Sequence, residues 1–337
     1  MRSLTLLKHN GMLAFLLPKS MLYVDSYNKL REHLFKNTQI VSIYDLGAKF
    51  KDVRGEQIIL ILRKSFSADN KVLIRTVKYK DRNINNQPSF LINQDTLRKM
   101  GKMLTFNKIE YYDLINKVSL MGEKLDDVVS GKICRGLPIG GNSEHIKTTG
   151  QGEEVIRGRN IAKFNIKQSI VLSFEMANKL STDKIKYLKN KKIVLQNIFS
   201  SEAGVIAAYD ARGILTLDTV TNIIVPDDKI GKYILALLNS KLINFYLMYY
   251  AFNCSRLTMH LDRSYIGLIP FIKPDSTIFN KVILLAEYSI KEKDPEEQKN
   301  MKKILDSLIY GIYSINKAEI MLIENAISDM LSKRSLW

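Results

Sequence analysis

The chain has 337 residues, of which 46% are hydrophobic and 25% charged, so it is long enough for two domains with cores and is not wholly disordered. Lysine and arginine number 51 against 34 acidic residues, which gives a formal net charge of +17. This excess indicates a polyanionic partner, and nucleic acid is the commonest one. Composition alone separates neither DNA from RNA nor a binding surface from a merely basic solvated one.

The positions of the cysteines and histidines and the nature of the apolar segments argue against a disulfide-linked, zinc-binding, secreted or membrane-spanning protein. Cys134 and Cys254 lie far apart in the sequence and outside any His/Cys cluster, so neither a disulfide framework nor a zinc site is encoded, and a cytoplasmic location fits. The four single histidines are assigned no catalytic role. Polar residues interrupt the apolar N-terminal stretch, which argues against a secretory signal. Residues 233–252 contain asparagine, serine and lysine, so they predict a buried helix and no membrane partner.

The first part of the chain predicts an incomplete α/β sheet. A short apolar strand at 11–17 ends in a proline, and apolar residues at helical spacing follow at 23–35. Two β-rich runs, 40–46 and 57–63, are separated by a polar loop and predict an antiparallel pair. These elements are typical of the far edge of a doubly wound sheet, whose other strands are missing upstream or supplied by another chain.

Residues 71–79 predict a further strand and 81–89 a polar loop, and the first domain is expected to cover 1–115. Residues 116–275 mix short strands, glycine-bearing turns and one long apolar helix, which predicts an α+β domain. Apolar residues at spacings of three and four predict a helical tail at 276–337.

The basic excess is concentrated between residues 130 and 200, where thirteen lysines and arginines face five acidic residues, a net +8. Two short loops there, GKICRG (131–136) and RGRN (157–160), are suited to entering a DNA groove from rigid strands. Arginine bridges guanine, asparagine or glutamine bridges adenine, and lysine mostly holds phosphates. The base-reading candidates are Arg135, Arg157, Arg159, Asn160 and Gln196, and further DNA-binding candidates are Lys132 and Lys163. The phosphate candidates are Lys184, Lys186, Lys189, Lys191 and Lys192.

Any one of these residues could instead be a solvated surface charge without a DNA contact. The prediction of DNA binding is therefore made for the cluster as a whole and not for each residue. The loop at 255–264 adds Arg256, Thr258 and Arg263 as a further DNA-facing edge. Asp218 and Thr219 are expected to order a turn through hydrogen bonds between side chain and backbone.

Residues 7–64 resemble the segment after the catalytic motif of adenine-specific (N6) DNA methyltransferases of restriction-modification systems. A glycine-led strand ends in a proline, a helix carries Leu30 and Arg31, and a strand leads into a loop with Phe50. The resemblance implies that Phe50 stacks on the flipped target base, because an enzyme that modifies the adenine amine takes the base out of the stack. The alternative is a hydrophobe that packs under the sheet.

Residues 120–273 resemble the TaqI-like C-terminal specificity domain, the target-recognition module of several such methyltransferases. The resemblance rests on the order of LDDVVSGKICRGLPIGG, GEEVIRGRNIAKFNI, KKIVLQNIFSSEAGVIAAYDARGILTLDTVTNII, and YILALLNSKLINFYL with RSYIGLIPF. Residues 305–327 look like the tail helices of fused restriction-modification proteins, with a generic helix pair as the alternative. The implied fold is a partial methyltransferase α/β sheet with C-terminal strands only, then an α+β target-recognition domain and a helical tail.

The methyl-transfer motifs of that family are absent from the sequence. There is no Pro-Pro for the catalytic loop, and the GxG at 150–152 lacks the preceding apolar strand of a donor site. No catalytic, cofactor or metal residue is assigned, and no nuclease pattern is defensible. The chain is therefore expected to be truncated and inactive alone, with S-adenosylmethionine belonging to the complete family enzyme.

The expected partners are double-stranded DNA and a separate methyltransferase half or a restriction subunit. The alternative is an RNA-binding or protein-interaction subunit without a methyltransferase role.

Overall fold

The computed structural model describes residues 2–50, 53, 55–65, 67, 69–77, 89–140, 143–200, 202–255, 257–292 and 294–332. Contacts divide the chain into two compact units. The first unit comprises Met1–Lys117 and Met248–Leu257, and the second comprises Val118–Leu247 and Thr258–Trp337. The segment Met248–Leu257 thus packs with a part of the chain that lies more than a hundred residues earlier in the sequence.

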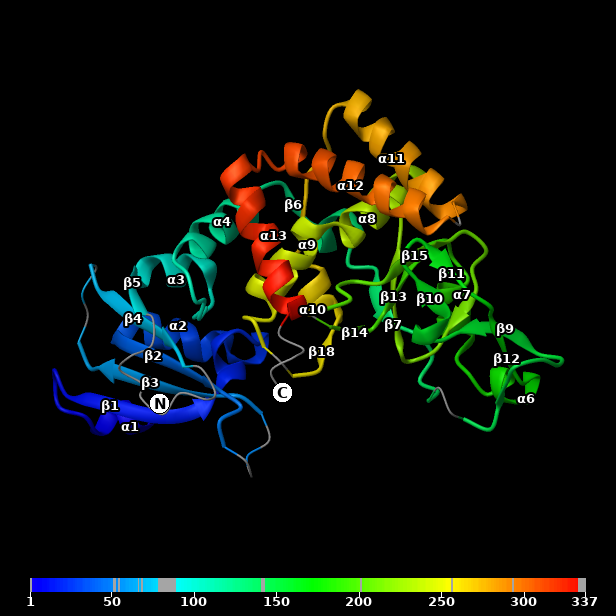
Figure 1. Ribbon diagram of the computed structural model, residues 1–337. Coiled ribbons are helices and arrows are strands. Elements are labelled where there is room, and N and C mark those ends of the chain that lie inside the picture. The colour runs from blue at the N-terminus through cyan, green and yellow to red at the C-terminus, as the bar shows by residue number, and fades with distance from the viewer. Residues whose placement is uncertain are drawn as a thin grey trace. The chain divides into compact units, whose positions relative to one another are not determined.

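A five-stranded sheet with strand order β1-β3-β2-β4-β5 forms the centre of the first unit (Figure 1). Its strands are β1 (Met12–Pro18), β2 (Gln39–Gly47), β3 (Gln57–Arg63), β4 (Lys71–Thr76) and β5 (Ser89–Asn93). The antiparallel pair predicted from the two β-rich runs is confirmed by β2 and β3. Only β4 is parallel to its neighbour β2 among the described pairings, so the sheet is mixed.

Short helices accompany this sheet (Figure 1): α1 (Arg2–Leu6), η1 (Lys19–Leu22), η2 (Asp25–Tyr27), α2 (Asn28–Asn37), α3 (Gln94–Met100) and α4 (Glu110–Ser119). The helix expected at 23–35 begins only at Asn28, because the preceding residues form the two 3-10 turns η1 and η2. The strand expected at 71–79 ends at Thr76 in β4, and residues 81–88 of the expected loop lie outside the described residues.

Arg31 joins these helices from inside the first unit. Its guanidinium is 1% exposed and donates to the carbonyl oxygens of Met21 (3.0 Å), Val24 (2.8 Å) and Gly101 (2.9 Å). A fourth hydrogen bond reaches the side chain of Asn28. The fixed fork of an arginine suits several acceptors at once, so Arg31 ties the 3-10 turns and α2 to the end of α3.

Lys102 is a buried cation in the same unit. Its side chain donates to the Tyr250 carbonyl at 3.1 Å and lies 4.5 Å from the centre of the Tyr250 ring. The pKa of Lys102 is lowered to about 8, mainly by burial; Asp25 opposes the shift and the nearby Arg31 adds to it. Because this pKa is below that of an unfolded lysine, the cost of burying the charge is fully present below pH 8 and is relieved as the pH rises toward 10.

We expect Lys102→Met to remove this pH dependence. Relative to the variant, the wild-type chain should gain about 2 kcal/mol of unfolding free energy between pH 7 and pH 10. Urea unfolding of both proteins at the two pH values measures this difference. If the unfolding free energies of the wild type and the variant change in parallel with pH, the prediction for Lys102 is contradicted.

The second unit contains two four-stranded sheets, with orders β16-β9-β12-β8 and β15-β13-β17-β7. Three two-stranded ribbons, β10-β11, β14-β18 and β19-β6, accompany them. The strands are β6 (Glu123–Lys124), β7 (Ile133–Arg135), β8 (Ile146–Lys147), β9 (Glu153–Ile156), β10 (Ile161–Ala162), β11 (Asn165–Ile166), β12 (Ile170–Leu172), β13 (Lys192–Gln196), β14 (Ile198–Phe199), β15 (Ala207–Asp210), β16 (Leu215–Thr216), β17 (Val220–Ile224), β18 (Met259–His260) and β19 (Pro270–Phe271).

Among the described residues of this unit, two apolar clusters of buried side chains lie at the sheets. One cluster includes Leu137, Val155, Leu172 and Leu215, and the other includes Val194 and residues on the neighbouring strands. The short turns and helices between the strands are α5 (Leu125–Val128), η4 (Gly158–Asn160), α6 (Phe174–Asn178), α7 (Thr182–Leu188) and α10 (Arg263–Ile266). Many short strands with few long helices agree with the α+β expectation for this part.

The long apolar helix expected at 233–252 is buried but broken. It consists of α8 (Asp228–Asn239), α9 (Lys241–Tyr246) and the π-helical turn η5 (Leu247–Ala251). Ser240 lies between the first two in an extended conformation, and its hydroxyl caps α9 by accepting from the Ile243 amide at 3.3 Å. The single-helix prediction was therefore wrong, because a serine able to cap a new helix stands in the middle of the apolar run.

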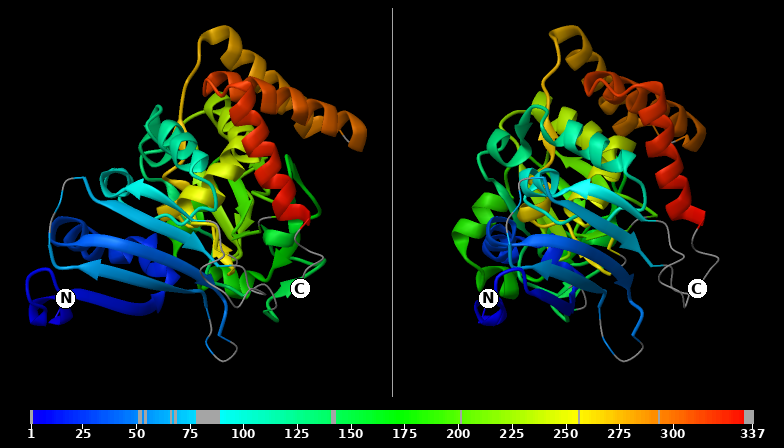
Figure 2. Two further views of the ribbon diagram at one scale, coloured as in Figure 1. Left: turned by 60° about the vertical axis from the view of Figure 1, so that its left-hand side comes forward. Right: turned by 90° about the vertical axis from the view of Figure 1, so that its left-hand side faces the viewer.

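Three longer helices, α11 (Ser276–Lys291), α12 (Pro295–Ile312) and α13 (Lys317–Ser332), form the helical tail. Helices α11 and α12 pack against each other, which Figure 2 shows in orange, and α13 follows in red. Helix α11 also packs on α8, and α12 and α13 pack on α9. The tail helices thus belong to the second unit.

The cysteines Cys134 and Cys254 are both free thiols. Within the described ranges, no three His, Cys, Asp or Glu side chains gather closely enough to hold a metal ion. Among the helices of that same part of the chain, none combines the length and the apolar character needed to cross a membrane.

Candidate nucleic-acid interface

Residues 217–219, which we call the junction loop, contact both segments that the sequence singled out as groove-entering loops. The loop prediction for GKICRG was wrong, because Ile133–Arg135 of this segment form strand β7 and pair with β17. The Thr219 hydroxyl accepts a hydrogen bond from the Gly158 amide at 3.0 Å, in the RGRN segment. The Asp218 carbonyl accepts one from Arg135 Nη1 at 2.6 Å, in the GKICRG segment. The junction loop therefore holds both segments in fixed positions. The Thr219 contact is one of the expected hydrogen bonds between side chain and backbone, whereas Asp218 acts through its backbone carbonyl, and its buried Oδ1 has no hydrogen-bond partner among the described residues.

Two of the predicted DNA-binding arginines form ion pairs within the second unit. Arg135 Nε lies 2.8 Å from Asp262 Oδ1, and Arg263 makes a bidentate contact with Asp126 at 2.8 and 2.9 Å. The side chains of Arg135 and Arg263 are 42% and 57% exposed. Such exposed pairs contribute at most about 1 kcal/mol, so a DNA phosphate or base is able to compete for either arginine.

The RGRN segment folds as the 3-10 turn η4, as its turn-like sequence suggested. Arg159 is exposed on this turn, and Arg157 is half-buried at its start. The Asn160 side chain is engaged at both ends, since it accepts from the Arg157 amide at 3.0 Å and donates to the Gln168 carbonyl at 2.7 Å. Likewise, the amide nitrogen of Gln196 donates to the carbonyl at the start of β10 at 2.9 Å. The base-reading predictions for Asn160 and Gln196 remain untested, but in this structure both amides bind backbone carbonyls.

The prediction that Lys192 binds phosphate is wrong. Its side chain is completely buried, and its ammonium lies 2.6 Å from both Asp210 Oδ2 and the Leu188 carbonyl oxygen. A group with no exposed surface does not reach a DNA backbone. The neighbouring lysines lie at or near the surface, where Lys184 donates to the Arg135 carbonyl, Lys189 pairs with Glu153, Lys191 pairs with Asp228, and Lys186 is exposed.

The other predicted contacts are spread over the second unit. Lys132 and Thr258 are exposed, and Arg256 lies outside the described residues. Lys163 is half-buried in the turn between β10 and β11, near Lys302 of α12. Burial and the neighbouring Lys302 lower the pKa of Lys163 to about 8, and the nearby Asp306 opposes the shift. An acidic side chain of the protein itself therefore already lies near this pair of lysines.

Phe50 lies in the loop between β2 and β3 of the first unit, and its side chain is 41% exposed. Its carbonyl oxygen accepts a hydrogen bond from the Val53 amide at 3.2 Å. The loop leaves the carboxyl end of β2, the edge at which ligands bind in open α/β sheets. An exposed ring there is available for stacking, and the assignment to the target base stays a prediction.

A buried polar cluster supports the start and the end of this loop. Lys19 and Asp45 form an ion pair at 2.7 Å with both side chains 4% exposed. Thr105 donates to the same Asp45 carboxylate at 2.8 Å, and Ser255 donates to Glu56 at 2.6 Å. Burial opposes the charge on Lys19, but Asp45 and Glu56 outweigh it and raise the pKa of that lysine above its ordinary value. The cluster fixes the two strand ends from which the Phe50 loop emerges.

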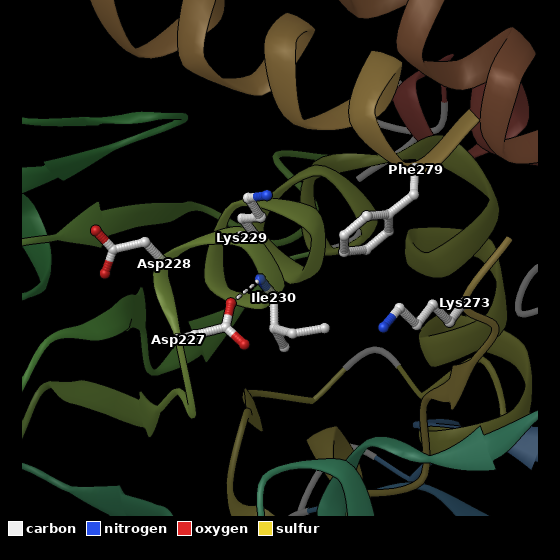
Figure 3. A pocket seen from close by; sticks show the side chains of 6 residues that line it. All are labelled: Asp227, Asp228, Lys229, Ile230, Lys273 and Phe279. Carbon is white, nitrogen blue, oxygen red and sulfur yellow. Dashed lines mark hydrogen bonds between the residues drawn. The ribbon is translucent and has the colours of Figure 1, made fainter. Parts of the chain in front are cut away.

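A surface pocket of about 350 Å³ lies at the start of α8 (Figure 3) and does not suit an anionic ligand. The carboxylate of Asp227 already caps the helix by accepting from the Ile230 amide at 2.8 Å, as Figure 3 shows. Asp228 adds a second carboxylate, and Lys273 lies 5.4 Å from the Phe279 ring centre. Because the helix N-terminus is occupied by the protein's own carboxylate, we do not place a nucleic-acid contact there.

Sequence reasoning missed one polar group beside the junction loop. His260 in β18 lies opposite Ile198 of β14, and its ring Nδ1 is 2.5 Å from the side-chain oxygen of Asn197. Asn197 also donates to Asp262, the partner of Arg135, at 3.2 Å. A single histidine in a two-residue strand gives no periodic pattern in the sequence, and its partner Asn197 is 63 residues away, so the sequence did not reveal this arrangement.

Comparisons with known proteins agree with the sequence resemblance. Residues 153–271 match the family model described as TaqI-like C-terminal specificity domain. The protein RM.MjaORFECS2P of Methanocaldococcus jannaschii, which its name describes as a type II restriction enzyme and methyltransferase, is 24% identical over 97% of this chain. The chain covers 29% of that protein.

Among solved structures, the type IIL restriction-modification enzyme MmeI in complex with DNA superposes with a TM-score of 0.59 at 11% identity. The match covers 96% of this chain and 50% of the MmeI chain, so the chain spans half or less of both relatives. At this identity the superposition shows a shared fold, a mixed α/β structure with several sheets and C-terminal helices. The chain thus contains a TaqI-like C-terminal specificity domain and is distantly homologous to type II restriction-modification enzymes with a methyltransferase.

Proposed function

We propose that this chain is the target-recognition part of a site-specific adenine DNA methyltransferase of a restriction-modification system. The observation that carries the proposal is the match of residues 153–271 to a specificity-domain family, and this match overlaps the basic stretch 130–200. The expected ligand is double-stranded DNA, since lysines and arginines at this density neutralise phosphates. The setting would be the cytoplasm.

The arrangement of the second unit supports this function. The junction loop holds the GKICRG and RGRN segments together, and Arg135 and Arg159 on these segments are exposed; Arg263 is exposed as well and pairs with Asp126. Specificity domains need rigidly held loops, because a base-reading side chain is selective only at a fixed position. The ion pairs of Arg135 and Arg263 keep these side chains oriented in the absence of DNA.

The first unit supports a role for a second, donor-binding half. Strand β1 lies at the edge of its sheet, and its apolar side chains Met12, Phe15 and Leu16 are 52%, 41% and 54% exposed. Uncharged apolar edge strands promote unwanted pairing, so such an edge is normally covered by another strand or helix. We propose that the methyltransferase half, in the same or another chain, covers β1.

S-adenosylmethionine is assigned to that half. At the carboxyl ends of β1 and β2, the side chains of Lys19 and Asp45 bind each other and are buried. They therefore do not fit the exposed ribose and amino-acid contacts that a methyl donor needs, and no chemical step is derived for this chain. Its proposed contribution is to bind the site and to present Phe50 to the flipped base.

We expect the purified chain to enrich a short motif from a random duplex DNA pool. Retention at two salt concentrations followed by sequencing measures this, and binding should weaken steeply with salt, as phosphate contacts require. Arg159→Ala should relax one position of the motif, because arginine reads guanine through two hydrogen bonds. Lys186→Ala is the matched control, and it should weaken all sequences alike.

Three outcomes separate the alternatives. Equal retention of every duplex would leave only a basic surface and would refute target recognition. Preferential binding of single-stranded RNA would favour the RNA-binding alternative. Methyl-donor binding by the isolated chain would contradict the assignment of the donor to another half.

A further inference from the structure

The side chain of His260 is held in one tautomer by Asn197. The amide nitrogen of Asn197 donates to Asp262 Oδ1 at 3.2 Å and to Thr221 Oγ1 at 2.9 Å. A carboxylate only accepts hydrogen bonds, so the amide nitrogen must face Asp262 and the amide oxygen must face His260. That oxygen lies 2.5 Å from the ring Nδ1 and also only accepts, so Nδ1 carries the proton of the neutral ring.

The surroundings of Asn197 make this orientation rigid. Its side chain is 1% exposed, and its backbone carbonyl accepts from the Leu261 amide at 2.7 Å. Asp262 is held in turn by Arg135 Nε at 2.8 Å. Arg135 Nη2, which only donates, lies 3.5 Å from the same His260 Nδ1 and by itself would favour a proton on Nε2. The Asn197 oxygen, which only accepts, lies nearer, at 2.5 Å, so the contact with Asn197 decides the tautomer.

The remaining ring nitrogen, Nε2, is a hydrogen-bond acceptor at an exposed position. His260 is exposed, and no group of the residues that the structure describes bonds to Nε2. The ring stands beside Arg135, in the same region as the junction loop that holds the two candidate groove-entering segments. A base-reading side chain needs an exposed hydrogen-bond acceptor that points in a fixed direction, and Nε2 is such an acceptor. A histidine that rotates freely presents either a donor or an acceptor, so it does not discriminate between bases.

We propose that His260 is a specificity-determining residue that accepts a hydrogen bond through Nε2 from an exocyclic amine in the major groove. Adenine N6 and cytosine N4 are the two base-edge amines that donate there, and guanine and thymine present acceptors in their place. Asn197 and Asp262 are positioning residues that act through the ring. The inference rests on the proposed DNA-recognition function and assigns one position of its site to adenine or cytosine.

The experiment compares the motifs that wild-type protein, His260→Ala and His145→Ala select from the same random duplex pool. His145 belongs to the same unit and has no contact with Asn197, so its variant is a matched control that should select the wild-type motif. His260→Ala should select the same motif except for one adenine or cytosine position that becomes relaxed. Its affinity for the wild-type site should fall about tenfold, as for one lost base contact.

A second arm removes the amine from the DNA. In the wild-type site, purine replaces adenine, or 2-pyrimidinone replaces cytosine, at the relaxed position. The wild-type protein should bind this duplex about tenfold more weakly, and His260→Ala should not distinguish the two duplexes. An unchanged motif for His260→Ala overturns the proposal while target recognition stands, whereas a wild-type protein that selects no motif overturns target recognition itself.

The tautomer is tested on the wild-type protein, which avoids any folding defect of a variant. Long-range ¹⁵N–¹H spectra of histidine-labelled protein distinguish protonated from unprotonated ring nitrogens. We expect the neutral His260 ring to carry its proton on Nδ1. A proton on Nε2 would leave a donor facing the DNA, and the proposal of an amine-reading acceptor would be refuted.

Discussion

Lys192→Met should destabilise the second unit by about 3–5 kcal/mol, whereas Lys191→Met, one residue earlier, should cost less than about 1 kcal/mol. The two lysines stand side by side in the sequence, but Lys192 pairs with Asp210 at 2.6 Å with side chains 0% and 1% exposed. Lys191 pairs with Asp228 at 2.9 Å with side chains 55% and 47% exposed. Water screens only the second pair.

The large cost arises because the Asp210 carboxylate would stay buried without its counter-ion. That carboxylate also accepts hydrogen bonds from the amides of Arg212 (3.0 Å), Gly213 (3.1 Å) and Ile214 (2.7 Å), which form the turn after β15. Methionine fills the space of the lysine stem but supplies no charge. The buried Asp210 carboxylate, which lies between the turn and the β13–β15 pair, therefore loses the ammonium group that neutralises it.

Urea unfolding of the full chain, followed by circular dichroism, measures both variants. Asp210→Asn combined with Lys192→Met should recover part of the loss, because the uncompensated charge is then removed, and the two changes should not add. Similar midpoints for Lys191→Met and Lys192→Met would show that burial does not distinguish these lysines. They would also reopen the assignment of Lys192 to the DNA-facing surface.

The lysines Lys191 and Lys192 also show which features of the structure could be predicted from the sequence and which could not. The antiparallel β2 and β3 were predictable, because each run is rich in β-formers and a short polar loop joins them. Five lysines between 184 and 192 look alike in the sequence, and only the pairing of β13 with β15 places Lys192 opposite Asp210. Lys192 is buried because its strand pairs with a strand whose Asp210 lies 18 residues later in the sequence. Local composition therefore did not single out this lysine.

In the candidate site, too, local features were predictable from the sequence and long-range contacts were not. Its basic segments and turn were visible as local patterns, and the match of residues 153–271 to the specificity domain confirms the family to which they point. The hydrogen-bond partners of those residues were not visible. The amides of Asn160 and Gln196 bind backbone carbonyls, and His260 depends on Asn197 in the bend between β13 and β14. Long-range partners decide whether a polar side chain is available to a ligand, and the sequence alone does not supply them.

Gly136→Ala should destabilise the second unit by about 3 kcal/mol or more, because the strand end at β7 leaves no room for a side chain. A Cβ on Gly136 would lie 2.2 Å from the carbonyl oxygen of Leu217 and 2.5 Å from that of Thr216. Both are backbone atoms, so they cannot move aside as a flexible side chain would. The Gly136 amide also donates to the Val220 carbonyl at 3.0 Å, and the Leu137 amide donates to the Thr216 carbonyl at 2.7 Å.

Separation of these segments would displace the junction loop and the Arg135 side chain that bonds to it, so DNA recognition should fall together with stability. Gly140→Ala is the matched control, since a Cβ there meets nothing within 4 Å, and its effect should stay within about 1 kcal/mol. Hydrogen exchange measured by mass spectrometry localises the change, which should concentrate in peptides covering 130–140 and 214–222. Unaltered exchange in both peptides of Gly136→Ala would mean that the backbone accommodates the methyl group, and the close approach of these strands would then not be what fixes the DNA-reading loops.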